Sequence, residues 1–201
     1  MIRGLKYWND KSTYYTQTNN PTEELLRKED GKGYLETCGP TSAVNILAAR
    51  GDDIVIKTPG SYKPQPEEIL TDWFNDPRNY AHMQALRDGV DPAVYMGNEI
   101  PQYYPAAIMA VFGVRAFFYW GSDWDHVTMA LSLQRGVMLA LKKPGHFIAA
   151  VAYREIEKAI IYRDPWPGNP WPVEWKNRSG FNRSISGLQL ENLQPYRIEI
   201  G

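Results

Sequence analysis

The only cysteine of the chain, Cys38, stands where a buried helix is predicted to begin. Val44 and Leu47 follow helical spacing, Pro40 has the fixed φ of a first helical turn, and Gly51 supplies a stop. The unpaired amide groups and the positive end of the dipole at a helix N-terminus favour an anion, and therefore a thiolate. A lone cysteine is most often a small buried hydrophobic residue, so nucleophilic chemistry at Cys38 needs partners elsewhere in the chain.

Two such partners follow in the sequence. His146 stands between Gly145 and an apolar run that is predicted to be a strand, residues 147–153. Asp164 precedes a proline and opens a loop directly after the next apolar run. A cysteine, a histidine and an acid therefore follow one another along the chain, and these are residue types from which a thiol-based nucleophilic site can be built.

With these motifs the chain resembles the C39-like branch of the papain-like cysteine peptidases. The pattern of that branch runs from a glutamine through Cys-Gly-Pro-Thr/Ser on a helix to Gly-His-Phe on a strand and then Asp-Pro, and this chain carries each motif. The resemblance covers roughly residues 14–170. It implies a papain-like fold, a peptide or protein substrate, and hydrolysis of an amide bond through an acyl-enzyme intermediate.

The resemblance also assigns roles to individual residues. His146, at the start of its strand, would exchange a proton with Cys38 and then protonate the leaving amine. Asp164 would bind the other ring nitrogen of His146 and fix the tautomer. Gln17, which matches the context of the family's glutamine, would stabilise the oxyanion with its side-chain amide together with the backbone N–H of Cys38. Asn19 and Asn20 are weaker candidates for that role.

The chain departs from papain itself in two respects. Gln17 is farther from the cysteine than in papain, and the Cys-Gly-Ser/Ala-Cys-Trp signature of the cathepsin group is absent. The resemblance is therefore to the fold and the catalytic apparatus. A surface loop amide remains the alternative interpretation of Gln17.

Two further histidines compete for the role of base. His82 has no glycine or acid pattern around it and is interpreted as a helix-surface residue, and His126 is interpreted as lying in the first turns of a helix. Neither residue forms a close pair with another metal ligand, so a zinc site is not expected, and no glycine-rich phosphate loop indicates a nucleotide. No cofactor is expected.

The elements that must position these residues fall into a helical half and a sheet half. Helices are predicted over 38–50, 66–74, 104–112 and 123–134, and strands over 114–120, 137–141, 147–153, 160–163 and 195–200, with a short strand near Tyr14 and Tyr15. The order indicates an α+β fold in which the helix that carries the nucleophile packs against a C-terminal antiparallel sheet. We expect one domain over 1–201, with a loop-rich segment at about 52–102, of which residues 75–102 are a candidate for an insertion over the cleft.

The composition sets further limits. The chain has 22 Lys and Arg against 23 Asp and Glu, so its net charge of -1 gives no general reason to bind nucleic acid. One cysteine excludes an internal disulfide. No signal peptide and no membrane-spanning run is recognised, so the expected location is cytoplasmic, with release to the cell wall by another route left open.

Three functions remain open at this point. The first is a peptidase with a Cys38–His146–Asp164 triad. The second is a phage-type amidase or endopeptidase that cleaves the stem peptide of peptidoglycan. The third is a papain-like module that binds a polypeptide or a glycan through its many loop aromatics without turnover.

Overall fold

The computed structural model describes residues 1–16, 37–54, 65–85, 100–142, 145–166, 180–186, 190 and 192–201. The strands are β1 (Ile2–Gly4), β2 (Ala116–Trp120), β3 (Gly136–Leu141), β4 (His146–Arg154), β5 (Ala159–Arg163), β6 (Arg183–Ser186) and β7 (Leu193–Ile200). The α-helices are α2 (Cys38–Arg50), α3 (Pro66–Asn75), α4 (Tyr80–Ala85), α5 (Tyr104–Phe112) and α6 (Trp124–Ser132). Short 3-10 turns occupy Lys11–Thr13, Pro77–Asn79 and Pro101–Tyr103.

The described strands form one antiparallel sheet in the order β2-β7-β3-β4-β5-β6. β1 lies off this path and pairs with the far end of β4, from Ile2 opposite Arg154 to Gly4 opposite Ala152. The last strand, β7, lies between β2 and β3. The C-terminal end of the chain therefore pairs with strands from the middle of the sequence. The connection from β3 through β4 to β5 is the antiparallel meander that the apolar runs predict.

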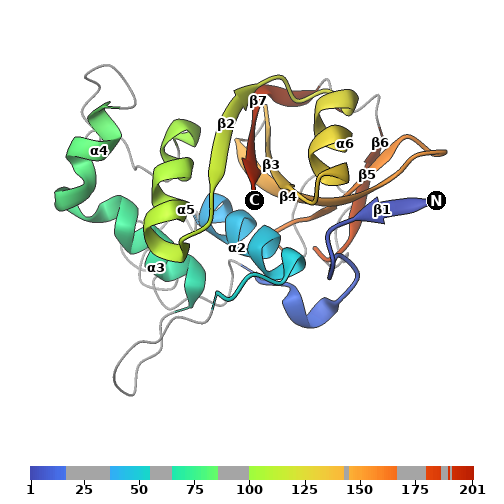
Figure 1. The fold of residues 1–201 in the computed structure, drawn as a ribbon. Coiled ribbons are helices and arrows are strands. Elements are labelled where there is room, and N and C mark those ends of the chain that lie inside the picture. The colour runs from blue at the N-terminus through green and yellow to red at the C-terminus, as the bar shows by residue number, and fades with distance from the viewer. Residues whose placement is uncertain are drawn as a thin grey trace, which may run out of the picture.

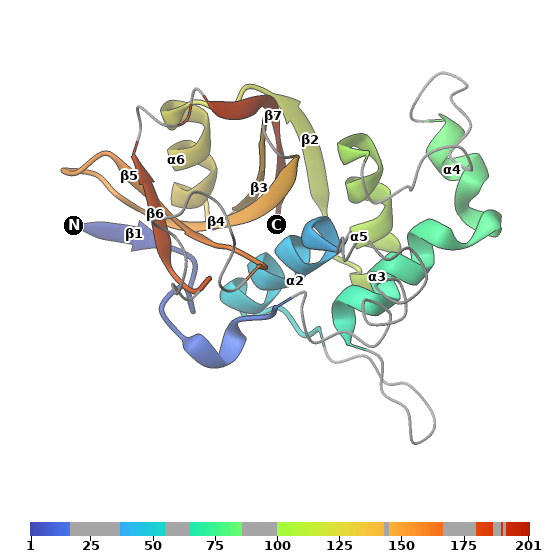
Figure 2. The same cartoon turned by 180° about the vertical axis from the view of Figure 1, so that it is seen from behind.

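The helix α2 forms the centre of the core. Every residue from Gly39 to Ala49 is buried, and the helix contacts β4, β3, β7 and α3. Gly136 of β3 is needed at this interface, because a Cβ there would collide with the Ile46 side chain. Figures 1 and 2 place strands β3 and β4 between α6 above and α2 below, so the sheet buries both of its faces.

The helices α3 and α5 extend the core beside α2, away from the sheet meander (Figure 2). A row of aromatic rings joins them to the sheet: Phe74 of α3 packs on Tyr104 of α5, which packs on Phe147 of β4. Each such buried ring removes a large apolar area from water, which is worth roughly 1.5–3 kcal/mol per side chain. The two halves of the fold are therefore joined through the cysteine-bearing helix and this aromatic row.

The α+β architecture expected from the sequence is confirmed, with differences at several elements. Tyr14 to Thr16 form no strand, because the backbone of Tyr15 bonds to a side chain of α2 instead. α6 ends before Gln134, which has a positive φ of 60°. β1 and β6 were not predicted, and α4 lies inside the segment expected to be rich in loops.

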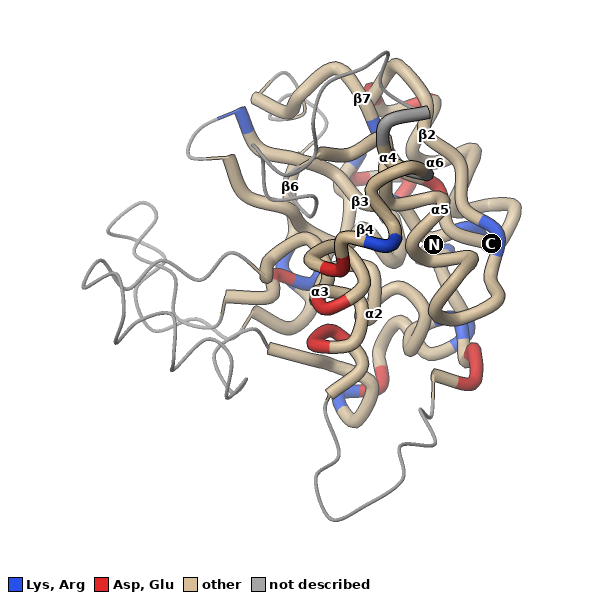
Figure 3. Tube along the Cα trace, turned by 90° about the vertical axis from the view of Figure 1, so that its left-hand side faces the viewer, with Lys and Arg blue, Asp and Glu red and all other residues tan. Residues whose placement is uncertain are grey.

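Charged residues of both signs occur along the described chain. Figure 3 shows them distributed over several elements, with an acidic group at α3 made of Glu67, Glu68 and Asp72. Glu67 and Glu68 lie in the first turn of α3, where a negative charge complements the helix dipole. Within the described residues, no helix has both the length and the apolar character needed to cross a membrane.

Candidate active site

Cys38 is the first residue of α2 and the point where that helix reaches the surface. The residues from Gly39 to Ala49 are buried, whereas Cys38 is partly exposed and carries a free thiol. Thr37 is the N-cap, and Gly51, with a φ of 86°, ends the helix by donating its N–H to Leu47 and Ala48. The sulfur therefore stands at the N-terminal end of a rigid helix, where unpaired amides favour negative charge.

His146 is the first residue of β4. It follows Gly145, whose φ of 75° permits the turn before the strand. Nε2 of the ring lies 2.7 Å from Oδ1 of Asp164, which leaves Nδ1 as the ring nitrogen for Cys38. Burial lowers the pKa of His146, but hydrogen bonds to Asp164 and Cys38 and the negative charges of both raise it to about 10.

Asp164 follows β5 and is 2 % exposed. Both of its carboxylate oxygens have hydrogen-bond donors. Oδ1 accepts from the backbone N–H of Trp166 at 3.0 Å as well as from His146, and Oδ2 accepts from Nη1 of Arg183 at 2.8 Å. Both oxygens of the carboxylate therefore accept hydrogen bonds. A buried charge requires such partners.

The backbone of Asp164 is fixed by two other segments. Its N–H donates to the carbonyl of Gly180 at 2.8 Å, and its carbonyl accepts the hydroxyl of Tyr14 at 2.6 Å. A Cβ on Gly180 would overlap both Asp164 and Tyr14, so only glycine fits there. Tyr14, near the start of the chain, and Gly180, which follows Asp164 in the sequence, therefore position the carboxylate-bearing residue.

The segment that leads to Gln17 is attached to α2 through Asn45. Its Oδ1 accepts the N–H of Tyr15 at 3.0 Å, and its Nδ2 donates to the carbonyl of Tyr15 at 2.9 Å. Asn45 is fully buried and lies on the same helix as Cys38. Gln17, Asn19 and Asn20 themselves lie outside the described residues.

The buried Arg163 attaches the same N-terminal segment to the sheet. Its guanidinium donates to the carbonyls of Tyr7 and Thr13 at 2.9 and 2.6 Å, and to that of Asn45 at 3.2 Å. Burial lowers the pKa of Arg163 to about 10, which still leaves the group charged at neutral pH. Arg163 directly precedes Asp164. The end of β5 therefore carries both the arginine that holds the N-terminal segment and the carboxylate that binds His146.

The competing histidines are placed elsewhere. His126 lies in the first turn of α6, with Nδ1 2.7 Å from Oδ1 of Asp123, and its side chain is 48 % exposed. Asp123 is the N-cap of that helix and also accepts the N–H of His126. His82 belongs to α4, but its side chain lies outside what the structure describes. His146 is the histidine that the structure brings to Cys38.

The described residues contain no group of three or more His, Cys, Asp or Glu that could hold a metal ion. The polar contacts of the site instead link Cys38, His146, Asp164 and Arg183 in a row. Arg183, Tyr14, Gly180 and Asn45 were not identified from the sequence, because their role depends on contacts between distant segments.

Comparison with known proteins gives one family. The model of a family described as Peptidase_C39 like matches residues 10–184, which include Cys38, His146 and Asp164. Curated proteins give no significant match.

Proposed function

The chain belongs to the peptidase C39-like family, and from that premise we propose that it hydrolyses peptide bonds with Cys38, His146 and Asp164 as a catalytic triad. Membership of this family indicates cysteine peptidase activity. The observation that carries the assignment of residues is the row of contacts from Cys38 through the buried ring of His146 to Asp164, with 2.7 Å between ring and carboxylate.

The proposed reaction begins with attack of the Cys38 sulfur on the substrate carbonyl carbon. His146 holds the thiol proton as imidazolium, and it donates that proton to the amine when the carbon–nitrogen bond breaks. The acyl group then remains on sulfur as a thioester. A water molecule, losing a proton to His146, attacks the thioester, and the carboxylic acid leaves while Cys38 recovers its proton.

The negative charge that develops on the carbonyl oxygen needs donors near Cys38. We assign this role to the backbone N–H of Cys38, which belongs to the unpaired first turn of α2, and to the side-chain amide of Gln17. Two observations support Gln17. The chain from Tyr15 is bonded to α2 by Asn45, and Gln17 is only two residues farther along.

The test compares wild type and Cys38→Ser on two substrates, a peptide library and purified cell walls, with new amino termini measured by mass spectrometry. We expect turnover by wild type and its near-complete loss in Cys38→Ser, because a hydroxyl at this position is a far weaker nucleophile than a thiolate. The chain has one cysteine, so iodoacetamide modifies a single defined sulfur and should abolish turnover as well.

The two substrates separate the proposed variants of the function. Cleavage of the library assigns a general peptidase, whereas cleavage confined to cell walls assigns a peptidoglycan stem peptide as substrate. Equal turnover by wild type and Cys38→Ser would contradict the proposal. Retention of a peptide or glycan after alkylation, with no cleavage before it, would identify a binding module in its place.

A further inference from the structure

Arg183 is the first residue of β6 and faces the catalytic acid. β6 pairs with β5 so that Arg183 stands opposite Tyr162, two residues before Asp164. The Arg183 side chain is 8 % exposed, and its Nη1 lies 2.8 Å from Oδ2 of Asp164. The guanidinium is therefore withdrawn from water and directed at the oxygen that His146 does not use.

The charges along the site alternate in sign. In the thiolate–imidazolium form that the proposed mechanism uses, the sulfur of Cys38, the ring of His146, the carboxylate of Asp164 and the guanidinium of Arg183 follow one another. A carboxylate that is 2 % exposed is costly to keep ionised unless both oxygens have charged or N–H partners. Arginine suits this position because its guanidinium stays charged when it is buried.

We propose that Arg183 is a positioning residue of this site, which binds Oδ2 of Asp164, balances its charge and keeps Oδ1 directed at His146. The inference rests on the proposed function for its catalytic consequence, but its structural part concerns the ring of His146 alone. Without the guanidinium, the uncompensated negative charge of the carboxylate would stabilise the imidazolium more strongly. The imidazolium would then be a weaker acid toward the leaving amine.

The charged and titratable groups around His146 and Asp164 determine whether loss of Arg183 raises or lowers the pKa of His146. Burial and the charge of Asp164 raise the pKa of Tyr14, and they raise that of Tyr162 to about 12, so both phenols stay neutral near pH 7. Removing the guanidinium therefore removes a positive charge that opposes the imidazolium, and the pKa of His146 should rise. Among the described residues, the titratable and charged groups that interact with the pair are Cys38 on α2, Tyr14 of the N-terminal segment, Tyr162 on β5 and Arg183 on β6, and Tyr196 on β7 interacts with Cys38.

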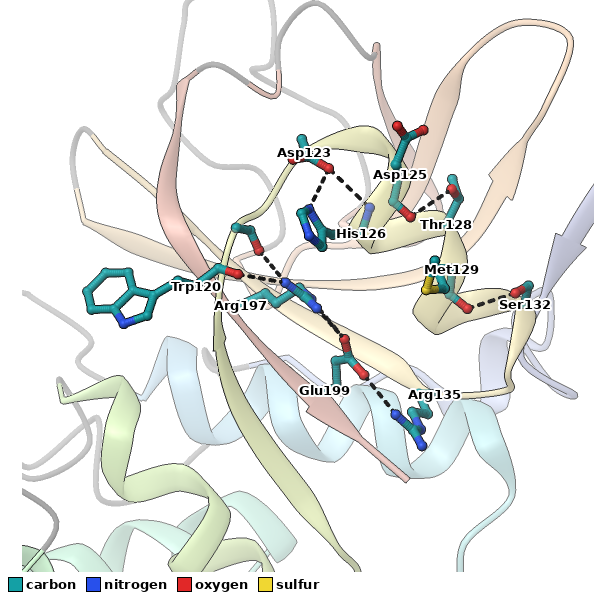
Figure 4. A network of polar contacts seen from close by, with 11 residues as sticks. Trp120, Asp123, Asp125, His126, Thr128, Met129, Ser132, Arg135, Arg197 and Glu199 are labelled. Carbon is teal, nitrogen blue, oxygen red and sulfur yellow. Dashed lines mark hydrogen bonds and ion pairs between the residues drawn. The ribbon is translucent and has the colours of Figure 1, made fainter.

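A second arginine–carboxylate network in the same sheet provides a matched control. Figure 4 shows Glu199 of β7 between Arg197 and Arg135, with Nη1 of Arg135 3.2 Å from Oε2 of Glu199. Arg197 also donates to the carbonyls of Trp120 and Gly121, so this network joins β7 to the end of β2. Arg135→Met removes a guanidinium from a buried carboxylate, as Arg183→Met does, but away from His146.

The experiment follows the ring signals of His146 by NMR titration in full-length Cys38→Ala, in which the thiolate is absent. Arg183→Met on this background should raise the pKa of His146 by about one unit. Arg183→Lys, which restores the charge, should return most of that shift, and Arg135→Met should leave the pKa unchanged. Thermal melting of each variant checks the fold, and Arg183→Gln, which keeps a hydrogen-bond donor without the charge, serves if Arg183→Met does not fold.

Kinetics in the native-cysteine background complete the test. Arg183→Met should lower kcat by about tenfold or more with little change in KM, and Arg183→Lys should recover part of the loss. An unchanged or lowered pKa of His146 in both variants, with only the melting temperature reduced, would make Arg183 a structural link between β5 and β6. Because the titration needs no turnover, an inactive wild type would overturn the proposed function without affecting this result.

Discussion

Asp164 and His146 form a buried pair in which the carboxylate Oδ1 lies 2.7 Å from Nε2 of the imidazole. The contact follows from the pairing of two neighbouring strands. His146 begins β4 and Asp164 follows β5, and because these strands are antiparallel the start of one lies beside the end of the other.

The first prediction concerns the choice of base. His146→Ala should lose nearly all turnover, because the thiol of Cys38 then has no proton acceptor. His126→Ala should retain it, because His126 is half exposed and bonds to Asp123 in the cap of α6. The measurement is kcat/KM of both variants on one peptide substrate. Full activity of His146→Ala together with loss in His126→Ala would reverse the assignment.

The second prediction concerns the alkaline limb of the pH profile. The hydrogen bonds and charges of Asp164 and Cys38 raise the pKa of His146 to about 10 against the opposing effect of burial, so kcat/KM should fall only as the pH approaches this value. Asp164→Asn keeps a hydrogen-bonding side chain but removes the charge. The pH at which kcat/KM begins to fall should therefore be lower by about 1 to 3 pH units.

The variant Asp164→Ala separates charge from orientation. It removes both the charge and the bond that holds the ring, so its kcat/KM should fall below that of Asp164→Asn. A rate equal to that of wild type, with only a lower melting temperature, would reduce the site to a Cys38–His146 dyad and leave Asp164 as a turn residue.

The third prediction concerns stability. The pKa of His146 rises from 6.5 to about 10 on folding, so its protonation stabilises the folded state fully below pH 6.5, and the contribution is lost as the pH rises to about 10. The difference in melting temperature between wild type and His146→Gln should therefore shrink from pH 7 to pH 10. A difference that grows over this range would show that the imidazolium does not stabilise the fold.

The fourth prediction concerns Gln17 and its attachment. Gln17→Ala should lower kcat by about 100-fold to 1,000-fold, which is typical for loss of one oxyanion donor. Asn45→Leu leaves the N–H and the carbonyl of Tyr15 without the side chain that binds them, so it should lower kcat as well.

A double-mutant cycle decides whether these two residues act together. If Asn45 positions Gln17, the double variant should be no slower than Gln17→Ala alone, because both changes remove the same stabilisation. Strictly additive losses in kcat would show that Asn45 acts independently of Gln17. The melting temperature of each variant serves as the control for the fold.

The residues that the sequence identified stand beside local signals. Cys38 lies two residues before a proline at a helix start, His146 follows a glycine at a strand start, and Asp164 precedes a proline at a strand end. Each signal depends on a few consecutive residues, so it is visible without a structure. The α+β class and the helix over 38–50 could be predicted for the same reason.

The partners of these residues could not be found in this way. Arg183 reaches Asp164 only because β6 pairs with β5, and β6 has only four residues, which is too few for a clear alternating pattern. Tyr14 contacts a residue 150 positions away. The insertion of β7 between β2 and β3 likewise depends on long-range pairing, which local propensity does not determine.

Gly180 is a position where this long-range packing leaves no room for a side chain. Its carbonyl accepts the N–H of Asp164 at 2.8 Å, and its Cα faces the point where the Tyr14 hydroxyl meets the Asp164 carbonyl. An added Cβ would come closer to the Asp164 backbone oxygen than real Cβ atoms approach any neighbour. Backbone cannot move aside as a flexible side chain can, so the loop that bears Asp164 would have to shift.

The fifth prediction is that Gly180→Ala lowers kcat about 100-fold, because a displacement of Asp164 by about 1 Å misorients the ring of His146. The same substitution should cost about 1–3 kcal/mol of unfolding free energy, as overpacking usually does. Tyr14→Phe loses the hydroxyl contact but keeps the ring, so its loss in kcat should be smaller, and Ser184→Ala at an exposed position of β6 should behave as wild type. Wild-type kcat in Gly180→Ala, measured with the unfolding free energy in urea, would mean that the loop accepts a methyl group without moving Asp164 and that this packing does not set the position of the acid.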